Sequence, residues 1–339
     1  MNIEYLYIDP LNPPSGYLEM LQKWYGKAKW EHFKKSQFEW YQKHPRFRIF
    51  TMKADSEFVG QAAAFGVDVF KNGRIIELWW GVDTFLFKQY RGSGKGKQLQ
   101  KQLHDDLPNF TSAAYTPING IIKKKCGCEP LFDKQEFYYG ISSYFSLLLS
   151  IFAYKVLKIN LSNKSIIPYV YSFYRHKKYK NYVISDALID TSLVGFINET
   201  LKSQYDFFVW RSVEYMKWKY EGNPAFHYRL LQFQNNGKTE ALLGFTDIHD
   251  YCIGGKPARS VKILDAIIDT NSKLTHKDLL EFVSDYYKQR KERIDGIFSL
   301  VKGKWNPKVS VSHPVLSTLK EKVNKPYLTF LDQDMEQVM

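Results

Sequence analysis

The feature that most constrains this chain is an order of local signals that occurs twice. A Trp/Tyr-bearing segment at 38–41 is followed by a His-Pro pair and then by a β-type run at 48–51. The segment 216–220 is likewise followed by an Asn-Pro pair and by the β-type run 228–231. Because proline disfavours helical geometry in the residue before it, a helix should end ahead of a strand in both places. One helix–strand unit is therefore expected in two copies.

Length and composition allow two copies and point to an anionic partner. The 339 residues are enough for about two domains of roughly 150 residues each. A hydrophobic fraction of 44% permits a sizeable core and excludes wholesale disorder. The 48 Lys and Arg residues exceed the 35 Asp and Glu residues, which gives a net charge of +13. This excess suits nucleic acid, an acidic membrane surface or a phosphorylated ligand, although a solvated basic surface accounts for most of it.

The cysteine content and the N-terminus indicate a cytoplasmic protein. Three cysteines are too few for a disulfide scaffold and fit a reducing compartment. Cys126-Gly127-Cys128 has no second cysteine pair nearby, so no metal site is expected. The first residues lack the basic start and apolar run of a signal peptide.

In the first half, the strand and helix signals follow one another closely. Asn72-Gly73 lies between two β-type runs and predicts a tight hairpin. Gly81 lies inside the long strand pattern 75–87 and is expected to mark a bulge. A helix should begin near Lys95 and carry a leucine stripe, with a short strand at 110–115 after it. A further helix is expected from Pro117 to Gly127, and His104 on the first of these helices is expected to be solvated.

The second half repeats the pattern after a connection. A hairpin is expected around 234–238, a strand at 261–268 and a helix at 279–287, which the charged run 288–293 should extend. A closing strand is expected at 296–300. The apolar stretch at 144–154 is too short to span a bilayer, which needs about 20 residues. It predicts a buried or interfacial helix, and the lysines that follow keep weak membrane-surface contact open as an alternative.

The most informative sequence for chemistry is Gln89-Tyr90-Arg91-Gly92-Ser93-Gly94-Lys95-Gly96-Lys97, which joins the long strand to an amphipathic helix. Glycines allow backbone N–H groups to converge, and a helix start adds unpaired donors and the positive end of the dipole. The sum is an anion cradle. The spacing fits neither the nucleotide P-loop nor the Gly-x-Gly-x-x-Gly dinucleotide fingerprint.

Arg91-x-x-Gly94-x-Gly96, placed between an antiparallel strand and a helix, resembles the pyrophosphate loop of the GNAT superfamily of N-acetyltransferases. The segment Lys125-Cys126-Gly127 also resembles the tail of that fold, whereas Asp269 to Lys273 in the second half has no glycine cradle. The whole is similar to tandem-GNAT proteins, including a group found with surface-polysaccharide synthesis genes. The resemblance implies an α+β chain of two GNAT-like domains, each with a twisted, mixed, mostly antiparallel sheet flanked by helices. The expected boundaries are 1–136 for an acyl-CoA-binding domain, 137–200 for a partly helical connection and 201–339 for a degenerate second domain.

The resemblance also implies a co-substrate and a reaction. Acetyl-CoA or another acyl-CoA would donate its acyl group to a primary amine, for example an amino sugar, and no metal is expected. The backbone amides of Arg91, Gly92, Ser93, Gly94, Lys95, Gly96 and Lys97 would hold the pyrophosphate. The strand edge at Phe85, Leu86 and Phe87 would pair with the pantetheine arm as an added strand does.

Such a transfer needs a base, oxyanion donors and an acid. Asp83 and Glu77 are the base candidates, and Asp83 is favoured because apolar neighbours can raise the pKa of a carboxyl group. Many family members place an acid tyrosine where this chain has Lys123, so Tyr115 is the substitute. Trp79, Trp80 and Tyr90 are candidates for stacking on a sugar, although adjacent strand residues face opposite sides and at least one tryptophan should lie in the core.

Two other classes remain open at the level of sequence. A tRNA-dependent aminoacyl transferase of the peptidoglycan-bridge type also uses two GNAT-like halves, and the basic excess suits it. The glycine cradle does not suit it, because such an enzyme has no need of coenzyme A, and a nucleic-acid partner is therefore not the expectation. A non-catalytic GNAT-fold protein is the third class, to which Lys123 in the tyrosine position lends weight. The oligomeric state is not predicted.

Overall fold

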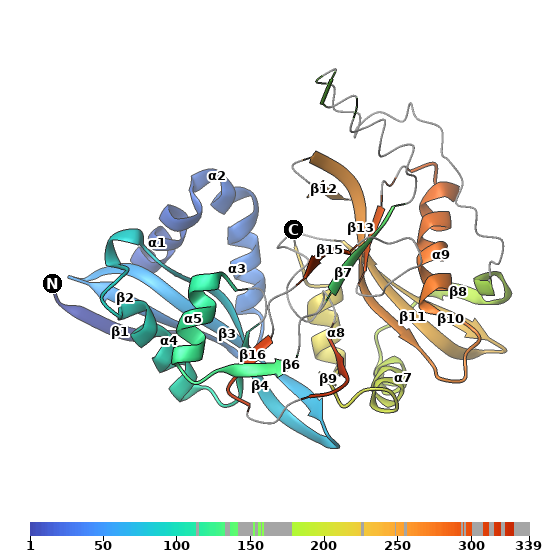
Figure 1. Ribbon diagram of the computed structural model, residues 1–339, viewed down its shortest axis with the longest axis horizontal. Helices are drawn as coiled ribbons and strands as arrows, with labels where there is room; N and C mark the ends of the chain where they lie inside the picture. The colour runs from blue at the N-terminus through green and yellow to red at the C-terminus, as the bar shows by residue number, and fades with distance from the viewer. Residues whose placement is uncertain are drawn as a thin grey trace. The chain divides into compact units, whose positions relative to one another are not determined.

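The computed structural model describes most of the chain (Figure 1). The residues that it describes are 1–112, 115–132, 136–141, 152, 155–156, 158, 178–224, 227–247, 249–253, 256–292, 294, 296–299, 308–311, 315–319 and 323–328. Most of the apolar stretch expected at 144–154 and most of the connection at 137–200 before residue 178 lie outside the described residues. Among the described residues, no helix has the length and apolar character needed to cross a bilayer.

The chain forms two compact units, and each unit is built from several separate segments. Unit 1 comprises Met1–Lys134, Tyr205–Ala225 and His313–Tyr327. Unit 2 comprises Gln135–Gln204, Phe226–Ser312 and Leu328–Met339. This division differs from the expected contiguous ranges 1–136, 137–200 and 201–339. The physical reason is that segments from the second half complete the sheet of unit 1, and a strand from the first half completes the sheet of unit 2.

Unit 1 is a mixed sheet with helices on both faces (Figure 1). Its strand order is β1 (Ile3–Ile8), β2 (Phe47–Ala54), β3 (Glu57–Lys71), β4 (Arg74–Leu86), β5 (Phe110–Ser112), β16 (Val315–Ser317) and β6 (Glu129–Phe132). The short strand β9 (Phe207–Val209) pairs with β3, and β17 (Pro326–Tyr327) pairs with β9. The helices are α1 (Ser15–Tyr25), α2 (Lys27–Lys29), α3 (Lys35–Gln42), α4 (Lys95–Asp106), α5 (Pro117–Lys125) and α8 (Val213–Tyr220).

Unit 2 has the same sheet plan. Its strand order is β15 (Lys308–Val311), β7 (Glu136–Ile141), β14 (Gly296–Ser299), β13 (Lys256–Ile268), β11 (Lys238–Thr246), β10 (Tyr228–Asn235) and β8 (Val183–Asp186), while β12 (His249–Ile253) pairs with β13. Among its described residues are the α-helices α7 (Thr191–Lys202) and α9 (His276–Gln289) and a short 3₁₀ helix, Lys178–Asn181. In both units three antiparallel strands lead to one parallel pair, β4 with β5 and β13 with β14. The expected α+β class with two helix-flanked sheets is confirmed.

A strand from the opposite half of the chain lies next to the parallel pair in each sheet. In unit 1, β16 lies between β5 and β6 and pairs antiparallel with both. In unit 2, β7 lies between β14 and β15 and pairs antiparallel with both. Each sheet is therefore complete only when both halves of the chain are present, which explains why the units are not contiguous in sequence.

The two predicted hairpin turns have the geometry that Asn-Gly favours. Asn72 and Gly73 have φ of 47° and 88°, and Asn236 and Gly237 have φ of 50° and 76°. Positive φ at both central residues matches the right-handed twist of the strands on either side. These turns fix the register of β3 with β4 and of β10 with β11.

Two local predictions are wrong. The bulge of β4 lies at Asp83, whose φ is 42°, and the register with β3 shifts between Gln61 and Ala63. Gly81 is in regular register; a Cβ there would lie 2.5 Å from the ring of Phe110, so close packing explains this glycine. Helix α9 also ends at Gln289 rather than continuing through the charged run.

Helix α9 ends because of backbone hydrogen bonds at its C-terminus that the residue types there do not predict. Lys291 adopts a φ of 58°, and its N–H donates to the carbonyl of Lys288 at 3.0 Å. The N–H of Glu292 donates to the carbonyl of Tyr287 at 3.0 Å. This pair of bonds is the Schellman arrangement, which glycine usually forms and which lysine forms here.

The core of unit 1 follows the predicted leucine stripe. Leu99, Leu103 and Leu107 are buried and pack in one cluster with Trp79 and Phe110. Removal of each side chain from water contributes on the order of 1.5–3 kcal/mol, which is enough to fix α4 on the sheet. The direction of α4, and hence of its N-terminal N–H groups, is set by this stripe.

The Trp-bearing helices of the two copies pack against each other within unit 1. The indole N–H of Trp40 donates to the carbonyl of Trp218 at 2.9 Å, and the indole of Trp218 donates to the carbonyl of Trp40 at 3.2 Å. Their rings stack with centroids 4.5 Å apart. The buried ammonium of Lys219 lies 4.8 Å from the Trp218 ring centroid and 5.3 Å from that of Trp40, which adds a cation–π attraction.

We expect the replacement of either tryptophan by leucine to lower the free energy of unfolding of unit 1 by about 2–4 kcal/mol. Each indole N–H donates to the backbone carbonyl of the other tryptophan. The double variant Trp40→Leu/Trp218→Leu should therefore lose about 0.5–1.5 kcal/mol less free energy of unfolding than the sum of the two single losses. Urea unfolding of the four proteins measures this coupling. The exposed Ile121→Leu is the control and should change stability by under about 0.5 kcal/mol. Strictly additive losses would contradict the reciprocal pairing.

Candidate active site

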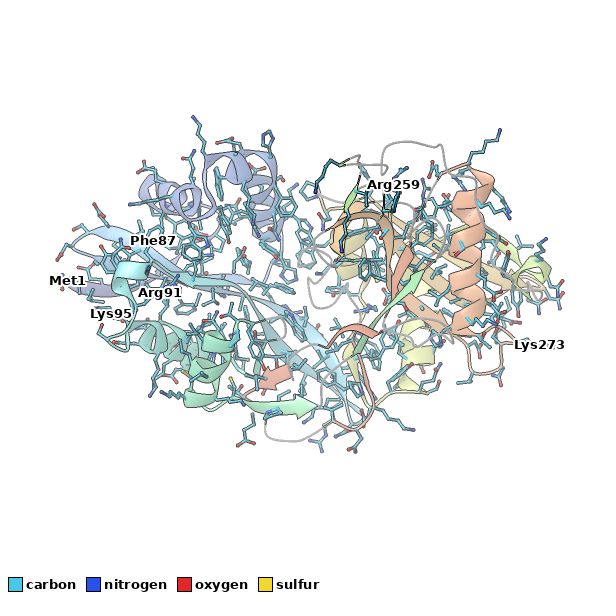
Figure 2. All side chains as sticks on the ribbon, turned by 45° about the horizontal axis from the view of Figure 1, so that its top comes forward. Met1, Phe87, Arg91, Lys95, Arg259 and Lys273 are labelled. Atoms are coloured by element: carbon cyan, nitrogen blue, oxygen red, sulfur yellow. The ribbon has the colours of Figure 1, made fainter. Side chains whose placement is uncertain are left out.

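The junction between β4 and α4 is an exposed loop shaped by two glycines. A short 3₁₀ turn, Lys88–Tyr90, follows β4, and Gly92 and Gly94 then take φ of 106° and 80°. L-residues with a Cβ rarely adopt such angles, which explains glycine at both positions. Gly94 is the residue that precedes α4, and it has no side-chain cap. Figure 2 labels Phe87, Arg91 and Lys95 along this junction.

Several backbone donors of this loop have no acceptor among the described residues, whereas the N–H of Arg91 donates to Lys88 at 3.1 Å and that of Gly94 to Gly92 at 2.7 Å. Within the described part of the chain, the N–H groups of Ser93, Lys95, Gly96 and Lys97 make no hydrogen bond. Ser93 and Lys97 are exposed, and Lys95 and Gly96 are partly exposed. Several free donors at the positive end of a helix attract phosphate-like anions. The junction that the sequence identified therefore has the donor set of an anion cradle.

Two contacts hold the side chain of Arg91 at the start of the glycine loop. Its Nε donates to the carbonyl of Leu86 at 2.8 Å, and its guanidinium lies 5.8 Å from the ring centroid of Trp24. The Trp24 ring in turn stacks on Phe85, with centroids 4.3 Å apart and planes 6° apart. Helix α1 thus covers the end of β4 with an aromatic layer, which the sequence alone did not connect to the loop.

At the corresponding helix start in unit 2, side chains of the protein accept hydrogen bonds from the backbone N–H groups. Thr275 and Asp278 form a capping box at the start of α9. Asp269 accepts from the N–H of Asn271 at 2.9 Å, and Ser272 accepts from the N–H of Leu274 at 3.1 Å. Figure 2 labels Lys273 in this loop. Carboxylates at these donors repel an incoming anion, so this junction lacks the cradle of unit 1.

On its β5 side, strand β4 has no strand partner beyond Trp80 among the described residues, although the carbonyl of Leu86 accepts from Nε of Arg91 at 2.8 Å. Among the described residues, β5 pairs with β4 only at Trp79 and Trp80. The strand continues to Leu86 beyond this pairing, and the N–H of Phe87 donates to Val59 on the β3 side at 3.0 Å. The positions Phe85, Leu86 and Phe87 therefore lie where an extended ligand arm can add to the strand.

Asp83 lies at the bulge among polar groups from three other elements. Its carboxylate interacts with the phenol of Tyr25 and lies 3.7 Å from Nζ of Lys34. Its backbone carbonyl accepts from Nε2 of Gln61 at 2.9 Å, and Gln61 in turn accepts from the hydroxyl of Tyr17. A non-glycine residue at positive φ persists only where its surroundings hold it, and such strain is common at functional positions.

The charge of Asp83 affects the phenols beside it. Burial raises the pKa of Tyr25 well above its usual value, and the Asp83 carboxylate raises it further. Burial raises the pKa of Tyr17 in the same way, with a smaller effect of Asp83. Both phenols are therefore neutral donors in this cluster at physiological pH.

The structure does not bring Glu77 and Tyr115 into this cluster. The Glu77 carboxylate lies 3.4 Å from Nη1 of Arg46, which also contacts Asp68 at 2.7 Å. Glu77 is 39% exposed, whereas Asp83 is 29% exposed. The ring of Tyr115 packs over Gly120, where a Cβ would lie 2.6 Å from it, and burial raises the pKa of its phenol.

The two adjacent tryptophans of β4 lie in the core rather than at a surface. Trp79 is 5% exposed and Trp80 is 1% exposed, so neither offers a free face for stacking on a sugar. Tyr90 is half-buried in the loop. The aromatic side chains around the bulge come from α1 and the turn after it. This region precedes the repeated segment that begins at residue 38, so the sequence analysis did not include it.

Lys123 and His104 form a second polar cluster under β5. Nζ of Lys123 lies 3.4 Å from the amide oxygen of Gln100 and 4.7 Å from the ring centroid of Phe110. His104 stacks on Phe110 with centroids 4.1 Å apart, and its Nδ1 lies 3.7 Å from Sγ of Cys128. The expectation that His104 is solvated is wrong, because it faces the leucine side of α4. Burial, helped by the charge of Lys123, lowers the pKa of His104 to about 4.

In the ranges that the structure describes, no three His, Cys, Asp or Glu side chains gather closely enough to hold a metal ion.

Comparison with known proteins identifies the fold. No family model matches the sequence, and no curated protein matches it. A probable N-acyltransferase from Enterococcus faecalis superposes with a TM-score of 0.61 at 13% identity, over 94% of this chain and 72% of that chain. N-myristoyltransferase from Saccharomyces cerevisiae with bound myristoyl-CoA gives 0.55 at 14%, over 94% and 83%. The chain therefore has the fold of N-acyltransferases.

A third similar structure narrows the description of the fold. A GCN5-related N-acetyltransferase from Anabaena variabilis superposes with a TM-score of 0.56 at 11% identity, over 93% of this chain and 72% of that chain. The architecture of this chain is accordingly the GNAT fold, as the resemblance of its loop implied.

The buried Lys123 predicts a particular pH dependence of stability. Burial lowers the pKa of Lys123 to about 8 from its ordinary 10.5, and the nearby Cys128 and Cys126 oppose this only in part. Between these pH values the unfolded chain binds the extra proton, so this group favours folding more as pH rises from about 8 to 10.5. Below about pH 8, folding must bury the ammonium or release its proton.

We therefore expect Lys123→Met to be more stable than the parent at pH 7, by up to about 3 kcal/mol. The advantage should shrink towards zero as pH rises through 10.5, and urea unfolding at pH 7, 9 and 10.5 measures it. The exposed Lys124→Met is the matched control and should differ from the parent by a constant amount. An advantage of Lys123→Met that does not change with pH would show that Lys123 is not desolvated in the folded state.

Proposed function

We propose that this protein is a GNAT-type N-acyltransferase, which moves an acyl group from coenzyme A to a primary amine. The observation that carries the proposal is the uncapped start of α4, where the N–H groups of Ser93, Lys95, Gly96 and Lys97 have no acceptor among the described residues. The diphosphate of coenzyme A is an anion of the kind that such donors bind. The fold shared with N-acyltransferases supports the same assignment.

The residues present fit an acyl-CoA. The loop from Arg91 to Lys97 would hold the diphosphate through backbone amides, and the edge at Phe85, Leu86 and Phe87 would pair with the pantetheine arm. The bound group supplies a thioester, whose carbonyl is the electrophile. Acetyl-CoA is the simplest such co-substrate, and longer acyl chains are compatible with the same cradle.

Asp83 is the proposed base for the acceptor ammonium. It is the carboxylate at the bulge, close to the loop along β4; the amide of Gln61 holds its backbone carbonyl, and the phenol of Tyr25 lies beside the carboxylate. Glu77 is the second candidate, but its side chain is engaged by Arg46. Tyr115 remains the proposed acid for the leaving thiolate, because Nζ of Lys123 is directed to Gln100 and Phe110.

The acceptor is proposed to be a small amine, and the resemblance to tandem-GNAT proteins of surface-polysaccharide synthesis favours an amino sugar. The three cysteines suit a reducing compartment such as the cytoplasm. The net charge of +13 favours binding of nucleic acid, so a tRNA-dependent aminoacyl transferase is the alternative function. Binding of tRNA with steep salt dependence and no binding of acetyl-CoA would favour that alternative.

Substitution in the cradle tests the proposal directly. We expect Gly94→Trp to abolish binding of acetyl-CoA in isothermal titration calorimetry, because a large side chain fills the space in front of the donors. Gly73→Trp is the matched control, since Gly73 has a similar φ of 88° and equally open space around its Cβ. Both variants carry the same backbone strain, but only the first should lose the ligand. Normal acetyl-CoA binding by Gly94→Trp would overturn the proposal.

Substitution of the two carboxylates separates binding from chemistry. Asp83→Asn should bind acetyl-CoA as the parent does and should release coenzyme A from an amine-dependent reaction about 100-fold or more slowly. Glu77→Gln should retain most of the turnover. The readout is thiol release in the presence of a panel of amines and amino-sugar nucleotides. A loss confined to Glu77→Gln would move the role of base to that residue.

A further inference from the structure

One primary amine of the chain already lies beside the proposed base. Nζ of Lys34 is 3.7 Å from Oδ1 of Asp83, and the Lys34 side chain is only 13% exposed. The ammonium also lies 4.9 Å from the ring centroid of Tyr25 and donates to Oε1 of Gln37 at 2.6 Å. An acceptor amine that gives its proton directly to Asp83 lies within a similar distance of this carboxylate.

Local backbone structure directs Lys34 to this place. It is the last residue of the π-helical turn Trp30–Lys34, which lies between α2 and α3. A π-turn holds one residue more than an α-turn and thereby changes the direction of the side chains that follow, and such turns are frequent at functional sites. Trp30 anchors the turn, since it is buried and stacks with Tyr25.

Neighbouring lysines lack this placement. Lys35 and Lys29 are exposed, whereas Lys34 is directed into the cluster around the bulge. Among the ion pairs of the described residues, Lys34 is the lysine that contacts Asp83. The loss of hydration offsets much of the attraction in a largely buried ion pair, so stability is a weak reason for an amine at this point.

We propose that Lys34 is an internal acyl acceptor, acylated in cis at Nζ by the acyl-CoA bound to the same chain. The inference rests on the proposed function, because the acyl donor is the thioester held at the loop. It adds a modification site at Lys34, and in this site Asp83 removes the proton from the Lys34 ammonium.

The step balances with the groups present. One proton of the Lys34 ammonium passes to the Asp83 carboxylate and then to solvent, which leaves a neutral amine with a free electron pair. Nζ attacks the thioester carbonyl carbon; the C–N bond forms and the C–S bond breaks. The second proton leaves the nitrogen as the amide forms and protonates the departing thiolate, which gives free coenzyme A. The product is one acyl-lysine for each chain.

Acylation changes the charge of the cluster. The ammonium of Lys34 becomes a neutral amide, so the ion pair with Asp83 and the cation over Tyr25 are both lost. The Asp83 carboxylate is then left with the Tyr25 hydroxyl as its partner in this group and is freed from an internal competitor for an external amine.

The experiment uses the full chain and acetyl-CoA with an isotopically labelled acetyl group. Peptide mapping by mass spectrometry should find the label at Lys34, at a rate about tenfold or more above that at Lys35. The fractional rate should not depend on protein concentration, as a reaction in cis requires. Lys34→Arg should lose the label at this site, and the matched variant Lys35→Arg should keep it at Lys34.

Asp83→Asn supplies the chemical test. The label at Lys34 should appear about 100-fold more slowly in this variant, while calorimetry shows unchanged acetyl-CoA binding and hence an intact fold. Binding of acetyl-CoA by the parent with Lys34 unlabelled would overturn the inference alone. So would equal labelling of exposed lysines, an unchanged rate in Asp83→Asn, or a rate that rises with protein concentration. Absence of acetyl-CoA binding by the parent would instead overturn the proposed function.

Discussion

The first turn of α4 leaves backbone donors without a protein acceptor in the described chain, and the rest of the site is arranged around this constraint. Free N–H groups at a helix start need water, a side chain or a ligand. Gly92 and Gly94 keep side chains away from them, and the buried leucine stripe of α4 prevents the helix from turning. An anion that binds here meets a fixed set of donors, which is a property of the packing as much as of the loop.

The two units show that one sheet plan supports two different helix starts. In unit 1 the strand–helix junction is rich in glycine and uncapped, whereas in unit 2 Thr275 and Asp278 complete a capping box. A capped start is locally more stable, by about 1 kcal/mol for each cap. Unit 1 gives up this stabilisation where a ligand can replace it. The shared topology therefore does not imply shared binding, and the capping residues distinguish the two units.

The bulge at Asp83 brings several polar side chains of unit 1 together. Its positive φ takes the carboxylate out of the alternation of β4, and Gln61 holds the backbone at this point. The phenol of Tyr25 and the ammonium of Lys34 then contact the carboxylate from elements earlier in the chain. A carboxylate, a neutral phenol and an amine are thus brought together at one irregularity of a strand.

The sequence by itself determined what depends on neighbours along the chain: the Asn-Gly hairpins, the leucine stripe of α4, the glycine loop and the helix–strand order of both copies. Each follows from backbone preference or periodicity within a few residues. Only the tertiary structure decided the burial of His104, the bulge at Asp83 instead of Gly81, the reciprocal pairing of Trp40 with Trp218, and the approach of Lys34 to Asp83. It also decided the exchange of β7 and β16 between the sheets. These features join residues that are far apart in sequence, and their positions depend on strand register and on the packing of several elements at once, which no local preference specifies.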